Sequence, residues 1–143
     1  MACITGHVGN VFFTRWQSAQ ATDINKILWE VSKAHATVGK LMVFVSIAPP
    51  EAEPPTAEVR QAFSASLKSL NEHLCMNIMV IEGDGLRKSL VRTIASAMIL
   101  ISGEGGKSAI VDNVGDALTR AKAHIADPAD SILQRARAQG FIV

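Results

Sequence analysis

The sequence has almost no excess of charge of either sign. Its 143 residues hold 14 lysines and arginines against 13 aspartates and glutamates, so the formal net charge is +1. Binding to nucleic acid depends on a concentration of positive charge that neutralises phosphates. The charge balance therefore predicts that nucleic acid is not a partner.

Cysteines are also scarce. Cys3 and Cys75 are the two in the sequence, whereas small secreted domains are usually held together by several disulfides. We recognise no signal peptide, so we expect two reduced thiols in a cytoplasmic protein.

Long apolar runs are missing as well. The longest lies within 95–101, far short of the roughly 20 residues that span a bilayer. We therefore expect no membrane partner. The sequence has no internal repeat, and hydrophobic residues make up 48% of it. This composition predicts one compact domain, with an α/β part at 1–126 and a helical extension of the same domain at 127–143.

The most informative stretch that is present is 40–47. Six of its eight residues are large and apolar, with no polar alternation. A strand covered on one face alternates apolar and polar residues, so this strand is predicted to lie centrally and to be covered on both faces.

The rest of the chain is arranged around this strand. An N-terminal hairpin is predicted from strands at 2–5 and 11–16, with Gly6, Gly9 and Asn10 supplying positive φ in its turn. Trp16 ends the hairpin and either caps the core edge or lines a groove. Further strands are predicted at 75–82 and 108–112, and helices begin near 22, 56, 86, 113 and 127.

The predicted order is β-β-α-β-α-β-α-β-α-α. Strands joined through helices are usually parallel neighbours with right-handed crossovers. We therefore expect an α/β fold: a mixed, mostly parallel sheet of about five strands with helices on both faces, plus an extra C-terminal helix. The binding crevice of such a sheet lies at the carboxyl ends of its strands, here at 17–22, 48–56, 83–85 and 112–113.

The helix predicted at 86–102 has two different halves. Arg87, Lys88 and Arg92 lie in its first turns, and its second half is apolar nearly all round until Gly103 breaks it. We expect the first half to be solvated and the second half to be buried.

Several features together resemble the STAS family, the anti-sigma-factor antagonist fold, over about residues 2–125. They are the opening hairpin, the apolar strand at 41–47, the step from loop to helix at Thr56, and the closing run Ile-Val-Asp-Asn-Val-Gly-Asp-Ala-Leu at 110–118. The chain looks most similar to the divergent group of small, stand-alone bacterial members. The resemblance implies a non-enzymatic signalling module that binds a protein partner.

The resemblance also implies phosphorylation of a Ser or Thr at the start of the helix after the central strand. Thr56 and Ser46 are the candidates. The family's acceptor usually follows Asp, whereas Pro55 precedes Thr56 here. Thr56 is therefore predicted either as a phosphoacceptor or as a plain helix N-cap.

A second hypothesis is a small anionic ligand, or an enzyme substrate, bound in the same crevice. Gly83, Asp84 and Gly85 precede a helix whose first turn carries Arg87 and Lys88. Backbone N–H groups at a helix start attract anions, and basic residues there oppose the helix dipole. The alternative is an ordinary solvated turn.

No pattern points to catalysis, to a metal or to a cofactor. The four histidines, His7, His35, His73 and His124, do not pair at metal-ligand spacing, and we predict no catalytic residue, no metal site and no cofactor.

The C-terminal segment 127–143 carries an apolar set consisting of Ile132, Leu133, Phe141 and Ile142. These side chains either pack on the domain's own sheet or form a homodimer interface. A structural homodimer is thus a third hypothesis for the function.

Overall fold

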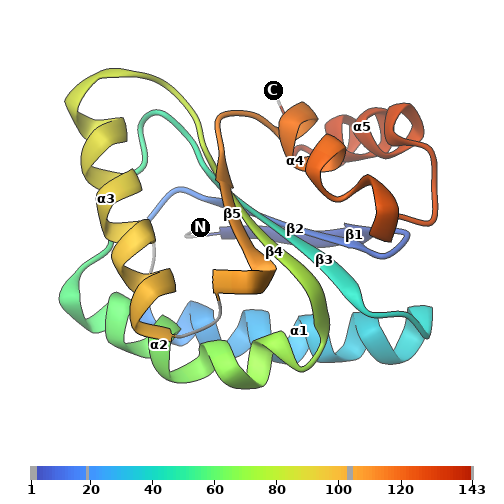
Figure 1. Cartoon of the computed structure of the whole chain (residues 1–143), viewed down its shortest axis with the longest axis horizontal. Helices are drawn as coiled ribbons and strands as arrows, with labels where there is room; N and C mark the ends of the chain where they lie inside the picture. The colour runs from blue at the N-terminus through green and yellow to red at the C-terminus, as the bar shows by residue number, and fades with distance from the viewer. Residues whose placement is uncertain (1–2, 19, 103–104, 143) are drawn as a thin grey trace.

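The structure, a computed structural model, describes residues 3–18, 20–102 and 105–142. Its centre is a five-stranded sheet in the order β1-β2-β3-β4-β5 (Figure 1). β1 and β2 are antiparallel, and the neighbours from β2 to β5 are parallel. The strands are Cys3–Val8 (β1), Val11–Trp16 (β2), Met42–Ala48 (β3), Leu74–Ile81 (β4) and Ser108–Val111 (β5).

Five α-helices occur in the described part of the chain. They are Ala21–Val38 (α1), Ala57–Asn71 (α2), Gly85–Ser102 (α3), Val114–Arg120 (α4) and Ala129–Ala138 (α5), and short 3-10 turns lie at Gly105–Lys107 and Lys122–His124. The predicted α/β class and element order are confirmed. Ala2 and Gly103, which were predicted to begin the first strand and to end the third helix, lie outside the described residues.

Strand β3 lies at the centre of the sheet and is buried on both faces, as predicted. Val43, Val45 and Ile47 belong to a core cluster with α4 and α5, whereas Met42 and Phe44 belong to a second cluster with α1 and α2. Figure 1 shows these two helix layers on opposite sides of the sheet. Alternate apolar side chains of β3 are therefore buried against opposite helix layers, and each Å² of apolar surface buried stabilises the fold by about 25 cal/mol.

The predicted hairpin turn is too long. β1 continues to Val8, and only Gly9 and Asn10 separate it from β2. Gly9 has a positive φ of 57°, but Asn10 and Gly6, which lies inside β1, do not have a positive φ. Asn10 is instead buried, where its side-chain amide donates to the carbonyls of Leu41 and His124 and its oxygen accepts from the N–H of Ala126. The side chain thus ties the hairpin to two distant loops.

Several predicted boundaries also move. The central strand begins at Met42 and not at Lys40, and Leu74 begins β4 instead of ending α2. α1 begins at Ala21, with Gln20 as its N-cap. Asp23, predicted with Thr22 as the possible cap, lies inside the first turn, where its carboxylate accepts from the backbone N–H of Gln20 in a capping box. Helix ends depend on such side-chain contacts, which an apolar pattern does not resolve.

The prediction that the second half of α3 is buried is wrong. Ala95 and Met98 are its buried residues in the described part, and the side chain of Leu100 is 81% exposed. α3 packs along α2, β4 and β5 at one side of the sheet. No described element lies on its outer face, so its apolar residues meet solvent there (Figure 1).

The C-terminal segment packs on the chain's own core. Ile132 and Phe141 are buried, Leu133 and Ile142 pack against the same cluster, and the ring of Phe141 stacks on Phe13 with centroids 5.4 Å apart. The first of the two predicted roles for this segment is therefore present. Dimerisation through it stays a prediction.

Candidate functional site

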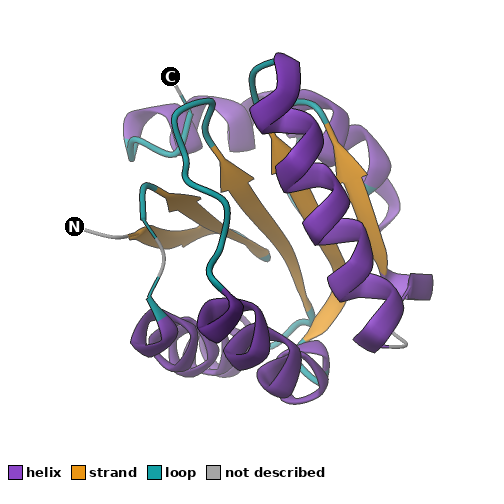
Figure 2. Ribbon diagram, turned by 90° about the vertical axis from the view of Figure 1, so that its left-hand side faces the viewer, coloured by secondary structure: helices purple, strands orange, loops and turns teal. Residues whose placement is uncertain are grey.

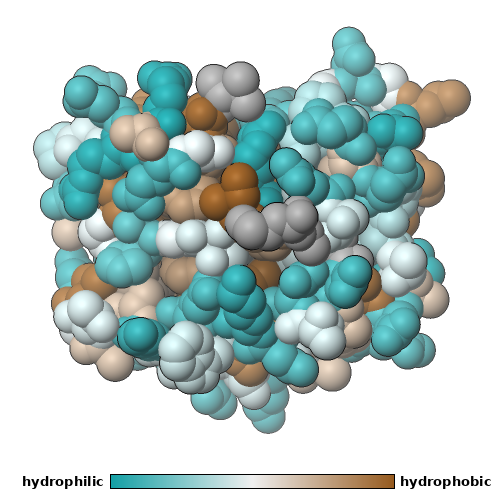
Figure 3. All heavy atoms as spheres, turned by 180° about the vertical axis from the view of Figure 1, so that it is seen from behind, coloured by the Kyte–Doolittle hydropathy of each residue, from teal (hydrophilic) through white to brown (hydrophobic). Residues whose placement is uncertain are grey.

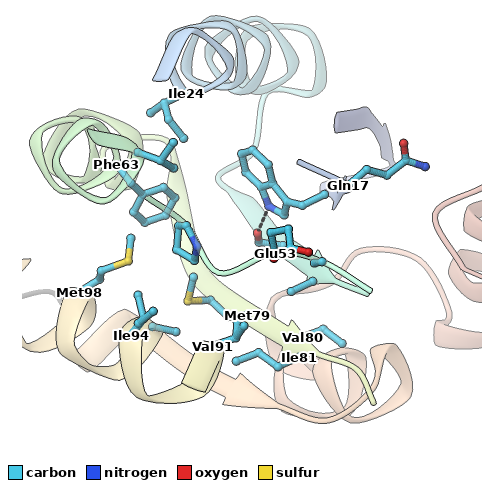
Figure 4. A pocket seen from close by; sticks show the side chains of 17 residues that line it. Gln17, Ile24, Glu53, Phe63, Met79, Val80, Ile81, Val91, Ile94 and Met98 are labelled. Atoms are coloured by element: carbon cyan, nitrogen blue, oxygen red, sulfur yellow. Dashed lines mark hydrogen bonds between the residues drawn. The ribbon is translucent and has the colours of Figure 1, made fainter. Parts of the chain in front are cut away.

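A narrow apolar crevice lies at the carboxyl ends of β2, β3 and β4. Its cavity volume is about 90 Å³. Side chains from α2, α3 and β4, among them Phe63, Ile94, Met98 and Met79, point toward one another across it (Figure 4). The other lining residues are Trp16, Gln17, Ile24, Ser46, Ala48, Ala52, Glu53, Pro55, Val59, Val80, Ile81, Val91 and Ala95.

A buried polar contact in this crevice joins β2 to β3. The indole N–H of Trp16 donates to the hydroxyl of Ser46 at 2.7 Å, and the hydroxyl of Thr14 lies 3.3 Å from the same oxygen. The Trp16 ring is fixed by this bond, so Trp16 lines the crevice, which is one of its two predicted positions. Ser46 is buried and its hydroxyl is hydrogen-bonded, and its role as a phosphoacceptor stays a prediction.

The loop 49–56 forms one wall of the crevice. In Figure 2 it runs from the end of β3 to the start of α2, opposite α3. The loop approaches Gly83 closely, because glycine has no Cβ: a Cβ at this position would lie 3.0 Å from the Cβ of Pro50. The φ of Gly83, 90°, is also one that glycine adopts most readily. Arg87 adds a second connection, because its guanidinium donates to the carbonyl of Glu51 at 3.2 Å and lies 3.7 Å from the carboxylate of Glu53.

The predicted anion-binding residues lie beside the crevice, and their cations already have carboxylate partners. The ammonium of Lys88 is 2.7 Å from the carboxylate of Asp112, and Arg92 is 3.7 Å from the same oxygen. The hydrogen bond and charge of Lys88 lower the pKa of Asp112 below its usual value. Asp84 and Gly85 are exposed at the turn. Arg87 and Lys88 therefore lie in the first turn of α3, as predicted, but each is paired with a carboxylate of the same chain.

Thr56 is exposed and caps α2. Its hydroxyl oxygen accepts from the N–H of Val59 at 3.3 Å. The predicted N-cap role is therefore present. A phosphate at this position would meet the free N–H groups and positive end of the helix dipole, so the capping geometry is also compatible with the phosphoacceptor role, which stays a prediction.

A wider groove runs outside the crevice, between α2 and α3. It has a volume of about 550 Å³ and is lined by Ala57, Arg60, Gln61, Ser64, Thr93, Ile94, Ala97 and Met98. Ile94 and Met98 line both hollows. These two side chains therefore lie between the inner crevice and the outer groove.

The remaining reactive side chains lie away from the crevice. Burial, reinforced by the charges of Asp23 and Glu30, raises the pKa of the Cys3 thiol to about 12. Burial also raises the pKa of Cys75. His35 and His73 lie 2.9 Å apart through their Nδ1 atoms, near the start of β3, where the carbonyl of His73 accepts from the N–H of Met42.

Neither a metal site nor a membrane span is found in the part of the chain that the structure describes. There, no three His, Cys, Asp or Glu side chains cluster in a way that would hold a metal ion. No described helix combines the length and the hydropathy needed to cross a bilayer.

The sequence prediction located the crevice but missed its apolar character. It emphasised the charged turn at 83–88, whereas the lining comes from strand ends and from Ala52, Val91 and Ala95. A signal was available in part, because apolar residues continue to the carboxyl ends of both central strands at Ala48 and Ile81. Apolar residues at such positions are usually predicted to be buried in the core. The hollow between them depends on the distances between the strand ends and the helices, which the sequence does not give.

A scan against models of known protein families finds no match to this sequence. A search of curated proteins also finds no match.

Proposed function

We propose that the chain is a non-enzymatic, STAS-like bacterial module of the cytoplasm that binds a partner protein at the crevice. A single apolar side chain of the partner enters the crevice. The partner's residues on either side of this anchor contact the loop 49–56 and the start of α3. The observation that carries this proposal is the apolar cavity bounded by Trp16, Phe63 and Met98.

The size of the cavity favours a side chain over a free ligand. Pockets for small molecules typically measure roughly 300–1,000 Å³, whereas this cavity measures about 90 Å³. That volume suits one aliphatic or aromatic group. Energetic hot spots of protein interfaces are often single anchors of this kind, seated in a desolvated pocket.

The charges near the crevice favour a protein partner over an anion. Arg87 and Lys88 are each within 4 Å of a carboxylate of the same chain. A bound anion would have to compete with Glu53 and Asp112 for them. A partner's polar rim can exchange hydrogen bonds with these exposed pairs while its anchor is buried.

Phosphorylation of Thr56 is the switch in this proposal. Thr56 follows Pro55, which lines the crevice, and it lies one turn before Arg60, whose N–H donates to the carbonyl of Thr56. A phosphate there would add about −1.5 to −2 charges at the rim. It would therefore change the partner's affinity without altering the core.

The test is selection from a phage-displayed peptide library, with binding followed through Trp16. A Trp29→Phe protein keeps Trp16 as its one tryptophan, since the sequence has two. We expect selected peptides to share one apolar anchor and to change the Trp16 emission. Affinity should fall at least about tenfold when that anchor is replaced by alanine.

Two neighbouring variants make the control. Ala95→Phe fills the crevice, whereas Ser96→Phe adds the same ring at an exposed position of the same helix that does not line the crevice. Peptide binding should be lost in the first variant and kept in the second, with circular dichroism confirming that both fold. Equal binding by the two variants, or selected peptides without an apolar anchor, would contradict the proposal.

A further inference from the structure

The outer face of α3 carries an exposed stripe of apolar and small residues. It consists of Leu86, Leu90, Thr93, Ala97 and Leu100, which recur at steps of three and four and so lie on one helical face. The side chains of Leu86, Leu90 and Leu100 are 89%, 51% and 81% exposed. In the rear view α3 lies behind the right-hand part of the molecule, and an apolar group protrudes at that edge (Figure 3).

This stripe points away from the protein's own core. Ala95 and Met98 are buried and lie on the opposite side of the helix. The ten residues 93–102 include no charged side chain. Exposed surface helices normally carry charges on their outer face, so a long uncharged face with protruding leucines indicates a surface that is covered in use.

The order of side chains along the stripe reads almost the same in both directions. Leu86 and Leu100 are equally distant from Thr93, and Leu90 and Ala97 lie on either side of it at three and four residues. If two copies of α3 packed antiparallel with their Thr93 residues together, each terminal leucine would meet the opposite leucine. In the same arrangement the bulky Leu90 would meet the small Ala97, which is the large-to-small matching that close helix packing needs.

The charges select the same orientation. Arg87, Lys88 and Arg92 all lie in the first half of α3. A parallel pair would bring the basic halves of both helices together, whereas an antiparallel pair places them at opposite ends of the contact. Each basic end then lies beside the carboxyl end of the other helix, where the dipole favours positive charge.

We propose that α3 forms a homodimer interface, in which two copies of the chain pack this stripe antiparallel about a twofold axis near Thr93. The adjoining groove between α2 and α3, with Arg60 and Ser64 on its α2 side, receives the edge of the second copy. Such an interface is isologous: the same patch meets itself. Because an 18-residue helix is only about 27 Å long, the interface belongs to the smaller size class and the dimer is concentration-dependent.

Analytical ultracentrifugation across a range from low micromolar to millimolar protein tests the association. We expect the wild-type mass to rise from monomer toward dimer. Leu90→Glu and Leu100→Glu should each weaken the dimerisation constant by about tenfold or more. Leu41→Glu and Trp29→Glu are matched controls at side chains that are 46% and 63% exposed elsewhere, and they should leave the constant unchanged. A wild-type chain that stays monomeric throughout, or equal weakening by the controls, overturns the proposal.

Cross-linking tests the geometry. In a background with Cys3 and Cys75 replaced by alanine, Thr93→Cys should form an intermolecular disulfide with copper phenanthroline, because the two positions meet at the axis. Leu100→Cys alone should not, but a mixture of Leu100→Cys and Leu86→Cys chains should give the mixed dimer. Faster cross-linking of Leu100→Cys alone than of Thr93→Cys would indicate parallel helices and overturn the proposed arrangement. Both tests are independent of peptide binding at the crevice.

Discussion

The close contact between the hairpin and the C-terminal segment gives a sharp test of the packing. Gly6 lies in β1 beneath the ring of Phe141. A Cβ at position 6 would lie 2.7 Å from Cζ of that ring and 3.2 Å from the side-chain oxygen of Gln139. Carbon atoms in favourable contact are about 3.5–4.0 Å apart, so Gly6→Ala needs the ring to move by roughly 1 Å.

The ring has little room for such a movement. It is buried and stacked on Phe13 with planes only 14° apart, and the carbonyl of Phe141 accepts from the guanidinium of Arg15 at 3.3 Å. Overpacking of this kind costs about 1–3 kcal/mol. Replacing Gly by Ala where φ is unstrained stabilises by about 0.4–1 kcal/mol through the unfolded chain. Gly6→Ala should therefore destabilise by about 0.5–2 kcal/mol.

A double-mutant cycle with Phe141→Leu separates the steric cost from other effects. Leucine lacks the Cζ atom, so the added methyl group has room and Gly6→Ala should become neutral or stabilising in that background. The coupling free energy should be about 1–3 kcal/mol. Urea unfolding of all four proteins, followed by circular dichroism, measures it as midpoint shifts of about 0.5 M per kcal/mol at constant slope. An equal penalty in both backgrounds would show that Phe141 does not cover Gly6.

Three further predictions follow from single side chains. Cys75 should react with iodoacetamide at pH 8 well before Cys3, because the Cys3 thiol has a pKa of about 12 and is only about one part in 10,000 ionised at that pH. Peptide mapping by mass spectrometry identifies the labelled site, and labelling of Cys3 before Cys75 in native buffer would contradict the burial of Cys3. Thr56→Ala should lower the free energy of unfolding by about 1 kcal/mol through loss of the α2 N-cap, whereas Thr56→Ser should not, as urea midpoints will show. Because Lys88 lowers the folded-state pKa of Asp112, their interaction should stabilise the protein above about pH 4 and be lost as the pH falls through that lowered pKa. The Asp112→Asn variant should be less stable than wild type at neutral pH and equally stable in strong acid, below both pKa values of Asp112. A constant stability difference across this pH range would refute the linkage.

The sequence predicted the sheet well because its strands lie in unbroken apolar runs. The residues of β3 and β4 had to be covered on both faces, and helices between them required parallel neighbours. The opposite faces of β2 were also predictable from alternation: Phe13 and Phe12 lie in different core clusters. The N-caps at Thr56 and Asn113 were predictable from residue type, since each side chain accepts from an N–H of the first helical turn.

Contacts between distant segments were not predictable in this way. The buried amide of Asn10 bonds to Leu41 and His124, and the ion pair between Arg15 and Glu82, at 3.1 Å, joins β2 to the residue that follows β4. Local sequence shows only a turn residue in the first case and two surface charges in the second. Whether a polar group is buried with a partner depends on which loops meet, and that is a property of the folded chain.

The sequence by itself determined which stretches form strands and helices and the order in which the sheet is built, because hydrophobic periodicity and turn chemistry act over a few residues. Only the tertiary structure decided that the apolar half of α3 faces water on its outer side, that Arg87 and Lys88 bind carboxylates of their own chain, and that the strand ends leave an apolar hollow. These features depend on the distance between elements and on what covers each face, and neither quantity is contained in the pattern of any one segment.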